Sequence, residues 1–142
     1  MSYKDIRNDM IKRHEGNRLK GGRHFAYRDT VGKLTIGYGR CLDDIGISED
    51  EALALLEHDL IAAENAVESL HLGELGEARR AALVDMAFNL GAAGLGKFKL
   101  MLEALRQGKW DLAAVEALDS DWADQVGKRA EEIARIIRTG EM

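Results

Sequence analysis

Two carboxylates and one hydroxyl within the first 35 residues could together perform acid–base chemistry. Glu15 ends an amphipathic run, Asp29 opens a turn-rich segment, and Thr35 lies in the β-branched run that follows. A protonated carboxyl can donate a proton, while a carboxylate with a hydroxyl beside it can hold or deprotonate water. Each residue also fits an ordinary role: a glutamate exposed at a helix end, an aspartate shaping a turn and a strand threonine. Their chemistry therefore depends on the elements that position them.

A helix and a small sheet are predicted to position these groups. Ser2 and Asp5 resemble a capping box, and apolar residues recur at helical spacing over about residues 3–15, before Gly16. The segment AYRDTVGKLTIGYG then predicts a small antiparallel sheet, because glycines punctuate its β-branched and aromatic residues: Tyr27, Val31, Thr35, Ile36 and Tyr38.

The rest of the chain is expected to be helical. Ser48 and Glu51 form a capping box that starts a long amphipathic helix. Its apolar face comprises Leu53, Leu56, Leu60, Ala63, Val67 and Leu70. After the linker HLGELGE, a helix over residues 78–90 is apolar nearly all round, as expected at the centre of a bundle. Further helices are predicted at about 97–106, 110–117 and 127–138, with Trp110 and Trp122 as core anchors.

Composition excludes several classes of protein. The 142 residues suit one folded domain, with 46% hydrophobic and 32% charged residues. The net charge of −5 and the lack of a basic stripe argue against nucleic-acid binding, so an anionic substrate would need a local basic patch. The apolar runs are too short to span a membrane, and the charged N-terminus lacks the apolar core of a secretory signal peptide. One cysteine and scattered histidines predict no disulfide, metal or cofactor.

The sequence resembles the phage-type lysozymes, the muramidases of the bacteriophage endolysin family. The family pattern is a Glu-Gly at the end of the first helix, a Tyr-x-Asp-Thr turn and a Thr-Ile-Gly-x-Gly strand. The similarity extends over essentially the whole chain, through RHEGNRLK, AYRDTVGKLTIGYG, RRAALVDMAFNLG, GKWDLAAVEAL and SDWADQVGKRAEEIARIIRTGE. Short pairs such as EG or DT carry no information alone, but the combination is specific.

The resemblance implies roles for the three residues. Glu15 would be the general acid, and the negative end of the helix dipole favours the protonated form of a carboxyl there. Asp29 would orient or deprotonate the attacking water, with the Thr35 hydroxyl as its hydrogen-bond partner. The family inverts the anomeric carbon, an outcome that requires carboxyls roughly 6.5–9.5 Å apart.

Three further residues align with family positions around the substrate. Phe88 and Cys41 correspond to positions that line the sugar-binding cleft, although plain core packing is the alternative for both. Arg129 corresponds to an arginine that approaches the catalytic glutamate from the other lobe, or is a surface helix arginine. Met101 and Glu116 stand where small polar residues occur in the family, so no polar substrate contact is assigned to them.

The segment between the two carboxylates departs from the family pattern. Deleting GGRHF would give EGNRLKAYRDT, a typical family spacing, so about five residues are inserted. Gly21 and Gly22 are expected to be flexible. Three consequences of the insertion are possible. It forms a surface bulge that leaves the site intact, or it displaces Asp29. Alternatively, it contacts the substrate at the edge of the cleft, with Phe25 stacked on a sugar and Arg23 near a peptide carboxylate.

The expected protein is therefore an α+β, mostly α, lysozyme-like domain spanning residues 1–142. A small lobe over about 13–60 holds the sheet, a long helix joins the lobes, and residues 70–142 with the N-terminal helix form the large lobe around a cleft. The resemblance implies a glycoside hydrolase that cleaves the glycan strands of peptidoglycan as a monomer, made in the cytoplasm and released to the wall through a holin. The alternative is a non-catalytic peptidoglycan-binding module that keeps the fold.

Overall fold

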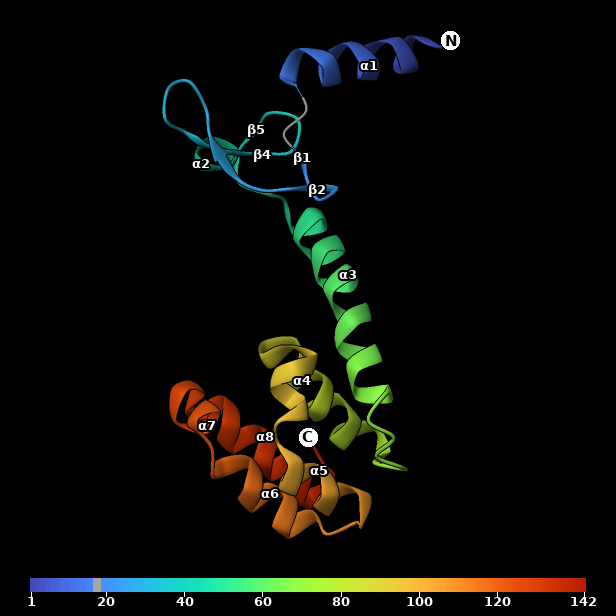
Figure 1. Ribbon diagram of the computed structural model, residues 1–142, viewed down its shortest axis with the longest axis vertical. Helices are drawn as coiled ribbons and strands as arrows, with labels where there is room; N and C mark the ends of the chain where they lie inside the picture. Colours follow the sequence, from blue (N-terminus) through green and yellow to red (C-terminus); the bar gives the residue numbers. More distant parts are fainter. Residues whose placement is uncertain (17–18) are drawn as a thin grey trace. The chain divides into compact units, whose positions relative to one another are not determined.

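The computed structural model describes residues 1–16 and 19–142 as an α+β, mostly helical protein (Figure 1). Asn17 and Arg18, which belong to the string EGNRLK, lie outside the described residues. The chain divides into two compact units, Met1–Leu53 and Ala54–Met142. The long helix α3 (Glu49–Glu68) contains the boundary.

The first unit begins with helix α1 (Tyr3–Glu15), as its caps predict. The Ser2 hydroxyl accepts from the Asp5 amide, and the Asp5 carboxylate accepts from the Ser2 amide, so the expected capping box is present. At the other end, Gly16 adopts φ 82° and its amide donates to the Lys12 carbonyl at 3.1 Å. This positive φ, which glycine adopts readily, ends the helix at Glu15.

A three-stranded antiparallel sheet in the order β3-β4-β5 follows, as expected: β3 (Tyr27–Arg28), β4 (Leu34–Ile36) and β5 (Arg40–Cys41). Thr35 in the central strand pairs with Tyr27 on one side and with Cys41 on the other. Val31 and Tyr38, expected in the sheet, lie in its two connecting turns. A short helix, α2 (Leu42–Ile45), which was not expected, continues directly from β5.

Most of the inserted residues belong to a short hairpin that also includes Leu19 and Lys20. Strand β1 (Leu19–Lys20) pairs antiparallel with β2 (Arg23–His24). Gly21 and Gly22 connect them with φ of 55° and 75°. Two positive φ values in a two-residue loop indicate a type I′ turn, the geometry that matches the twist of paired strands. The glycine pair is therefore a two-residue turn between paired strands, and its flexibility stays a prediction.

Helix α3 starts as predicted and is tied to the sheet at its first turn. The Glu51 amide donates to the Ser48 hydroxyl at 3.1 Å, and Glu51 Oε1 accepts from the Ser48 amide at 2.9 Å. Both Glu51 oxygens also accept from the Arg40 guanidinium, at 2.8 and 2.7 Å. Of the predicted apolar face of α3, only Ala63 and Val67 are buried.

The second unit contains α4 (Gly76–Gly96), α5 (Lys99–Arg106), α6 (Trp110–Leu118), α7 (Asp121–Val126) and α8 (Lys128–Thr139). Helix α4 is interrupted at Gly91, whose φ of 76° and ψ of 167° are not helical. Helix α7 was not expected. Helix α8 contacts α4, α6 and α7, so α8 is the shared neighbour in this unit. The expectation that the 78–90 helix lies at the centre was wrong, because α4 buries only one side.

The core of the second unit is continuous, and its largest fully buried side chains come from three helices, α4, α5 and α8: Leu83, Met86, Leu95, Met101, Leu105 and Ile137. Trp122 is buried, stacks edge to face with Phe98 and donates from Nε1 to Asn89 Oδ1 at 2.7 Å. Trp110 packs against the core with the Arg79 guanidinium 4.0 Å from its ring centre. Both tryptophans are core anchors, as predicted. None of the helices in the described part of the chain is long and apolar enough to cross a membrane.

Candidate active site

Glu15 is the last residue of α1, and its carboxyl group lies against the backbone of Gly39. A Cβ atom on residue 39 would be 2.8 Å from both Cδ and Oε2 of Glu15, closer than any side chain tolerates. Gly39 itself has φ 90°, in the turn between β4 and β5. The sequence Thr-Ile-Gly-Tyr-Gly therefore serves two purposes: it makes a strand and turn, and it leaves room for this carboxyl.

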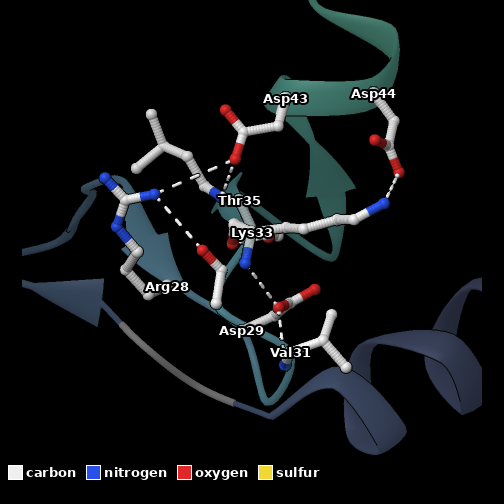
Figure 2. A network of polar contacts seen from close by, with 9 residues as sticks. Arg28, Asp29, Val31, Lys33, Thr35, Asp43 and Asp44 are labelled. Carbon is white, nitrogen blue, oxygen red and sulfur yellow. Dashed lines mark hydrogen bonds and ion pairs between the residues drawn. The ribbon is translucent and has the colours of Figure 1, made fainter.

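Asp29 follows β3 and is held by the turn that it begins (Figure 2). Its Oδ1 accepts from the amides of Val31 at 3.0 Å and Lys33 at 2.8 Å, while its own amide donates to the Lys33 carbonyl at 2.9 Å. Within residues 1–16 and 19–142, no hydrogen bond engages Oδ2. One oxygen thus fixes the side chain and the other is left for a ligand or water.

Thr35 is the buried polar residue of the sheet, with 4% of its surface exposed. Its hydroxyl donates to the Lys33 carbonyl at 3.0 Å, so the hydroxyl oxygen can still accept a hydrogen bond. Lys33 also donates its amide to Asp29, so the same residue links the aspartate to the threonine. Cys41 lies beside Thr35 in the ladder, half-buried and without a disulfide.

A network of charged groups clamps the Asp29 turn to helix α2. Lys33 Nζ donates to Asp44 Oδ2 at 2.6 Å, and Asp43 Oδ2 accepts from the Leu34 amide at 2.7 Å (Figure 2). Arg28 donates to the Gly32 carbonyl at 3.2 Å and lies 3.9 Å from Asp43. The Lys33 ammonium lowers the pKa of Asp44, and the Cys41 thiol acts in the same direction through a hydrogen bond. In turn, the Asp44 carboxylate raises the pKa of Lys33.

Arg40 and Glu51 form the second tie of the sheet. The bidentate guanidinium and the Ser48 cap together lower the pKa of Glu51 to about 2. Arg40 also donates to the Gly46 carbonyl at 3.1 Å, so it closes the segment between β5 and α3. At a partly exposed site, two parallel hydrogen bonds between a guanidinium and a carboxylate fix the orientation of both groups but add little to the free energy of unfolding.

Two predicted binding residues lie together in the second unit. Phe88 and Arg129 line a cavity of ≈ 650 Å³, bounded on its apolar side by Leu56, Leu60 and Val84. Phe88 is 44% exposed, so simple core packing does not describe it. Arg129 Nε donates to Asp85 Oδ1 at 2.8 Å.

The structure places the predicted residues in two groups. Glu15, Asp29, Thr35 and Cys41 belong to the first unit, and Phe88 and Arg129 belong to the second. The expected approach of Arg129 to Glu15 stays a prediction. Met101 is fully buried, which agrees with assigning it no substrate contact. Within the described ranges, no three His, Cys, Asp or Glu side chains are arranged to hold a metal ion.

Sequence reasoning missed the residues that support the site. Asp43 and Asp44 could have been noticed as two acids directly after a strand, a typical start of a short helix. Asp85 is a lone acid within the apolar string ALVDMAF, which signals a partner of opposite charge. Its pairing with Arg129, 44 residues away, has no local signal.

Comparison with known proteins identifies the family of this chain. The family model for phage lysozyme matches residues 13–138, a span that contains every candidate residue. The chain is 31% identical to probable T4-type lysozyme 2 of Dictyostelium discoideum, over 93% of each protein. It is 32% identical to the pre-baseplate central spike protein Gp5 of Enterobacteria phage T4, over 94% of this chain and 28% of that protein. An endolysin of Bacillus phage B103 is also 32% identical, over 94% of this chain and 52% of that protein. On the extent of these matches, the chain belongs to the phage lysozyme family.

Proposed function

We propose that this protein is a muramidase that hydrolyses the β-1,4 bond between N-acetylmuramic acid and N-acetylglucosamine in peptidoglycan, with inversion at the anomeric carbon. Membership of the phage lysozyme family supports a peptidoglycan hydrolase of the lysozyme type. The particular bond, the stereochemistry and the residue roles belong to the proposal.

The arrangement of Asp29 is the observation that carries the proposal. A turn-forming aspartate needs only one oxygen for its two amide hydrogen bonds, and Oδ1 meets that need here. The second oxygen remains available on a carboxylate that cannot rotate away without breaking both bonds. A side chain fixed in this way, with the Thr35 hydroxyl tied to the same Lys33, is suited to holding one water molecule.

In the proposed reaction, protonated Glu15 gives its proton to the glycosidic oxygen as the bond from that oxygen to the anomeric carbon breaks. Positive charge develops on the sugar ring. Water held by Asp29 and Thr35 attacks the anomeric carbon from the opposite face, and its proton passes to Asp29. Exchange with solvent then returns the proton to Glu15 and removes it from Asp29, so no cofactor is consumed.

The cavity of the second unit is proposed to bind the sugar chain. The exposed ring of Phe88 offers an apolar surface to a sugar face, and Cys41 is proposed as a contact from the sheet. The Asp85 carboxylate holds Arg129 through Nε and so limits the orientations of its guanidinium. The protein is further proposed to act as a monomer and to reach the wall through a holin-type pore.

Lysis of permeabilised Gram-negative cells tests the central assignment. Wild type is expected to clear the suspension, and Glu15→Gln is expected to lose at least about two orders of magnitude, the scale of general-acid removal. Glu132→Gln is the matched control, because Glu132 is exposed on α8 and makes no hydrogen bond or ion pair with a described residue. Equal lysis by wild type and Glu15→Gln would remove Glu15 from the mechanism.

The same preparation separates catalysis from binding alone. A folded wild type that sediments with peptidoglycan but releases no reducing sugar would indicate a non-catalytic binding module. For an active enzyme, proton NMR of the first product identifies the mechanism: inversion predicts the α-anomer before mutarotation, whereas the β-anomer would indicate retention.

A further inference from the structure

The hairpin β1-β2 presents two cations side by side, with no counter-ion among the described residues. Lys20 and Arg23 are directly opposite each other across the type I′ turn, and both are exposed. Like charges directly opposite in a ladder are destabilising. Neither side chain forms an ion pair with any residue in the described part of the chain. An external anion would remove this repulsion.

Contacts through Tyr38 tie the hairpin to the turn beside Glu15. The His24 ring packs edge to face on Tyr38, with ring centres 5.0 Å apart. Lys12 Nζ lies 5.5 Å from the same ring. Tyr38 immediately precedes Gly39, the residue against which the Glu15 carboxyl lies. The hairpin that carries the two cations therefore packs against the turn that also contacts the Glu15 carboxyl group.

Basic residues are concentrated in the first 40 residues of the chain. Residues 1–40 contain ten of the 20 lysines and arginines but four of the 25 aspartates and glutamates, and five further acids at positions 43–51 bring the first unit to ten cations and nine acids. The overall charge of −5 would repel a polyanion, so attraction has to be local. The hairpin places two of these cations at an exposed tip.

We propose that Lys20 and Arg23 bind carboxylates of the peptidoglycan stem peptides and so hold the substrate beside Glu15. This inference rests on the proposed function. Each muramic acid carries its peptide on the sugar whose bond is cleaved, so these carboxylates accompany every scissile bond. The arginine fork matches a carboxylate in two hydrogen bonds, and the lysine adds a point charge. Phosphate groups of other wall polymers offer similar chemistry, and the test separates the two sources.

Binding is measured in the Glu15→Gln background by sedimentation with purified sacculi at low ionic strength. Lys20→Gln with Arg23→Gln is expected to weaken binding about three- to tenfold, the range of exposed charge contacts. The matched control, Lys4→Gln with Lys109→Gln, removes two exposed lysines without a described ion pair and is expected to bind like the parent. Thermal unfolding of each protein verifies that it is folded.

Three substrates identify the anion. The double substitution is expected to weaken binding to peptide-bearing, phosphate-free peptidoglycan and to leave binding to amidase-stripped glycan strands unchanged. Equal weakening on stripped strands, weakening only when phosphate polymers are present, or equal weakening by the control would overturn the proposal. Since binding is measured without turnover, its outcome is independent of whether wild type releases reducing sugar, which tests the proposed function.

Discussion

Replacing Gly39 with alanine is expected to move the Glu15 carboxyl group. The new Cβ would be 2.8 Å from Cδ and Oε2, whereas ordinary contact begins at 3.4 Å. The carboxyl therefore has to retreat by about 0.6 Å. Because a displacement of about 1 Å in a catalytic group can cost 10²-fold in rate, Gly39→Ala is expected to lower kcat roughly ten- to hundredfold.

Backbone strain is a separate effect of the same substitution. A φ of 90° is unfavourable for alanine, and residues outside their preferred region cost about 1–3 kcal/mol. Gly37→Ala is the control in the same turn: its φ is 65°, and a Cβ there would meet no atom within 4 Å. It is expected to lower the free energy of unfolding with little change in kcat.

The assay is initial-rate release of reducing sugar from purified peptidoglycan, with urea unfolding of the same samples. The geometric argument predicts a kcat for Gly39→Ala at least about tenfold below that of Gly37→Ala when both proteins are folded. Equal kcat values for the two variants would refute it, since strain alone would then explain the loss.

Two further predictions concern carboxylates of the first unit. Asp29→Asn keeps an oxygen for the Val31 and Lys33 amides, so the free energy of unfolding in urea should change little. Turnover should fall by at least about two orders of magnitude, because the variant cannot accept a proton from water. A variant that does not fold would show that the charge of Asp29 is needed for the structure. The pKa of Glu51 is lowered from 4.5 to about 2, so its stabilising contribution is present above pH 4.5 and is lost as the pH falls through about 2. Melting temperatures should therefore fall more steeply over this range in wild type than in Glu51→Gln, and parallel curves would contradict the role of the Arg40 pair.

The elements whose ends carry local signals could be predicted from the sequence. Helix α1 begins with the Ser2 capping box and ends at Gly16, and α3 begins with the Ser48 box, as local hydrogen bonds require. The three-stranded sheet followed from its glycine and β-branched pattern. These signals also place Glu15, Asp29 and Thr35 on the correct elements.

Short elements were missed because their signals are few. Helix α7 has only the Ser120 cap, and α2 has only two acids after a strand. The hairpin β1-β2 had a usable signal, because a Gly-Gly pair between short strands favours a type I′ turn.

Contacts between distant residues could not be predicted at all. The Asp85–Arg129 pair and the stacking of His24 on Tyr38 depend on how helices and turns pack, and no spacing in the sequence encodes them. The fit of Glu15 against Gly39 is of the same kind, since 24 positions separate the two residues. These contacts hold the candidate site residues in place, and they can be seen only in the folded structure.

The reducing end of the released sugars tests the proposed function most directly. Peptidoglycan digested with wild type and reduced with borohydride should yield N-acetylmuramitol, and the Glu15→Gln digest should yield about a hundredfold less. Production of N-acetylglucosaminitol would contradict the assigned bond, and undiminished N-acetylmuramitol from Glu15→Gln would contradict the assigned acid.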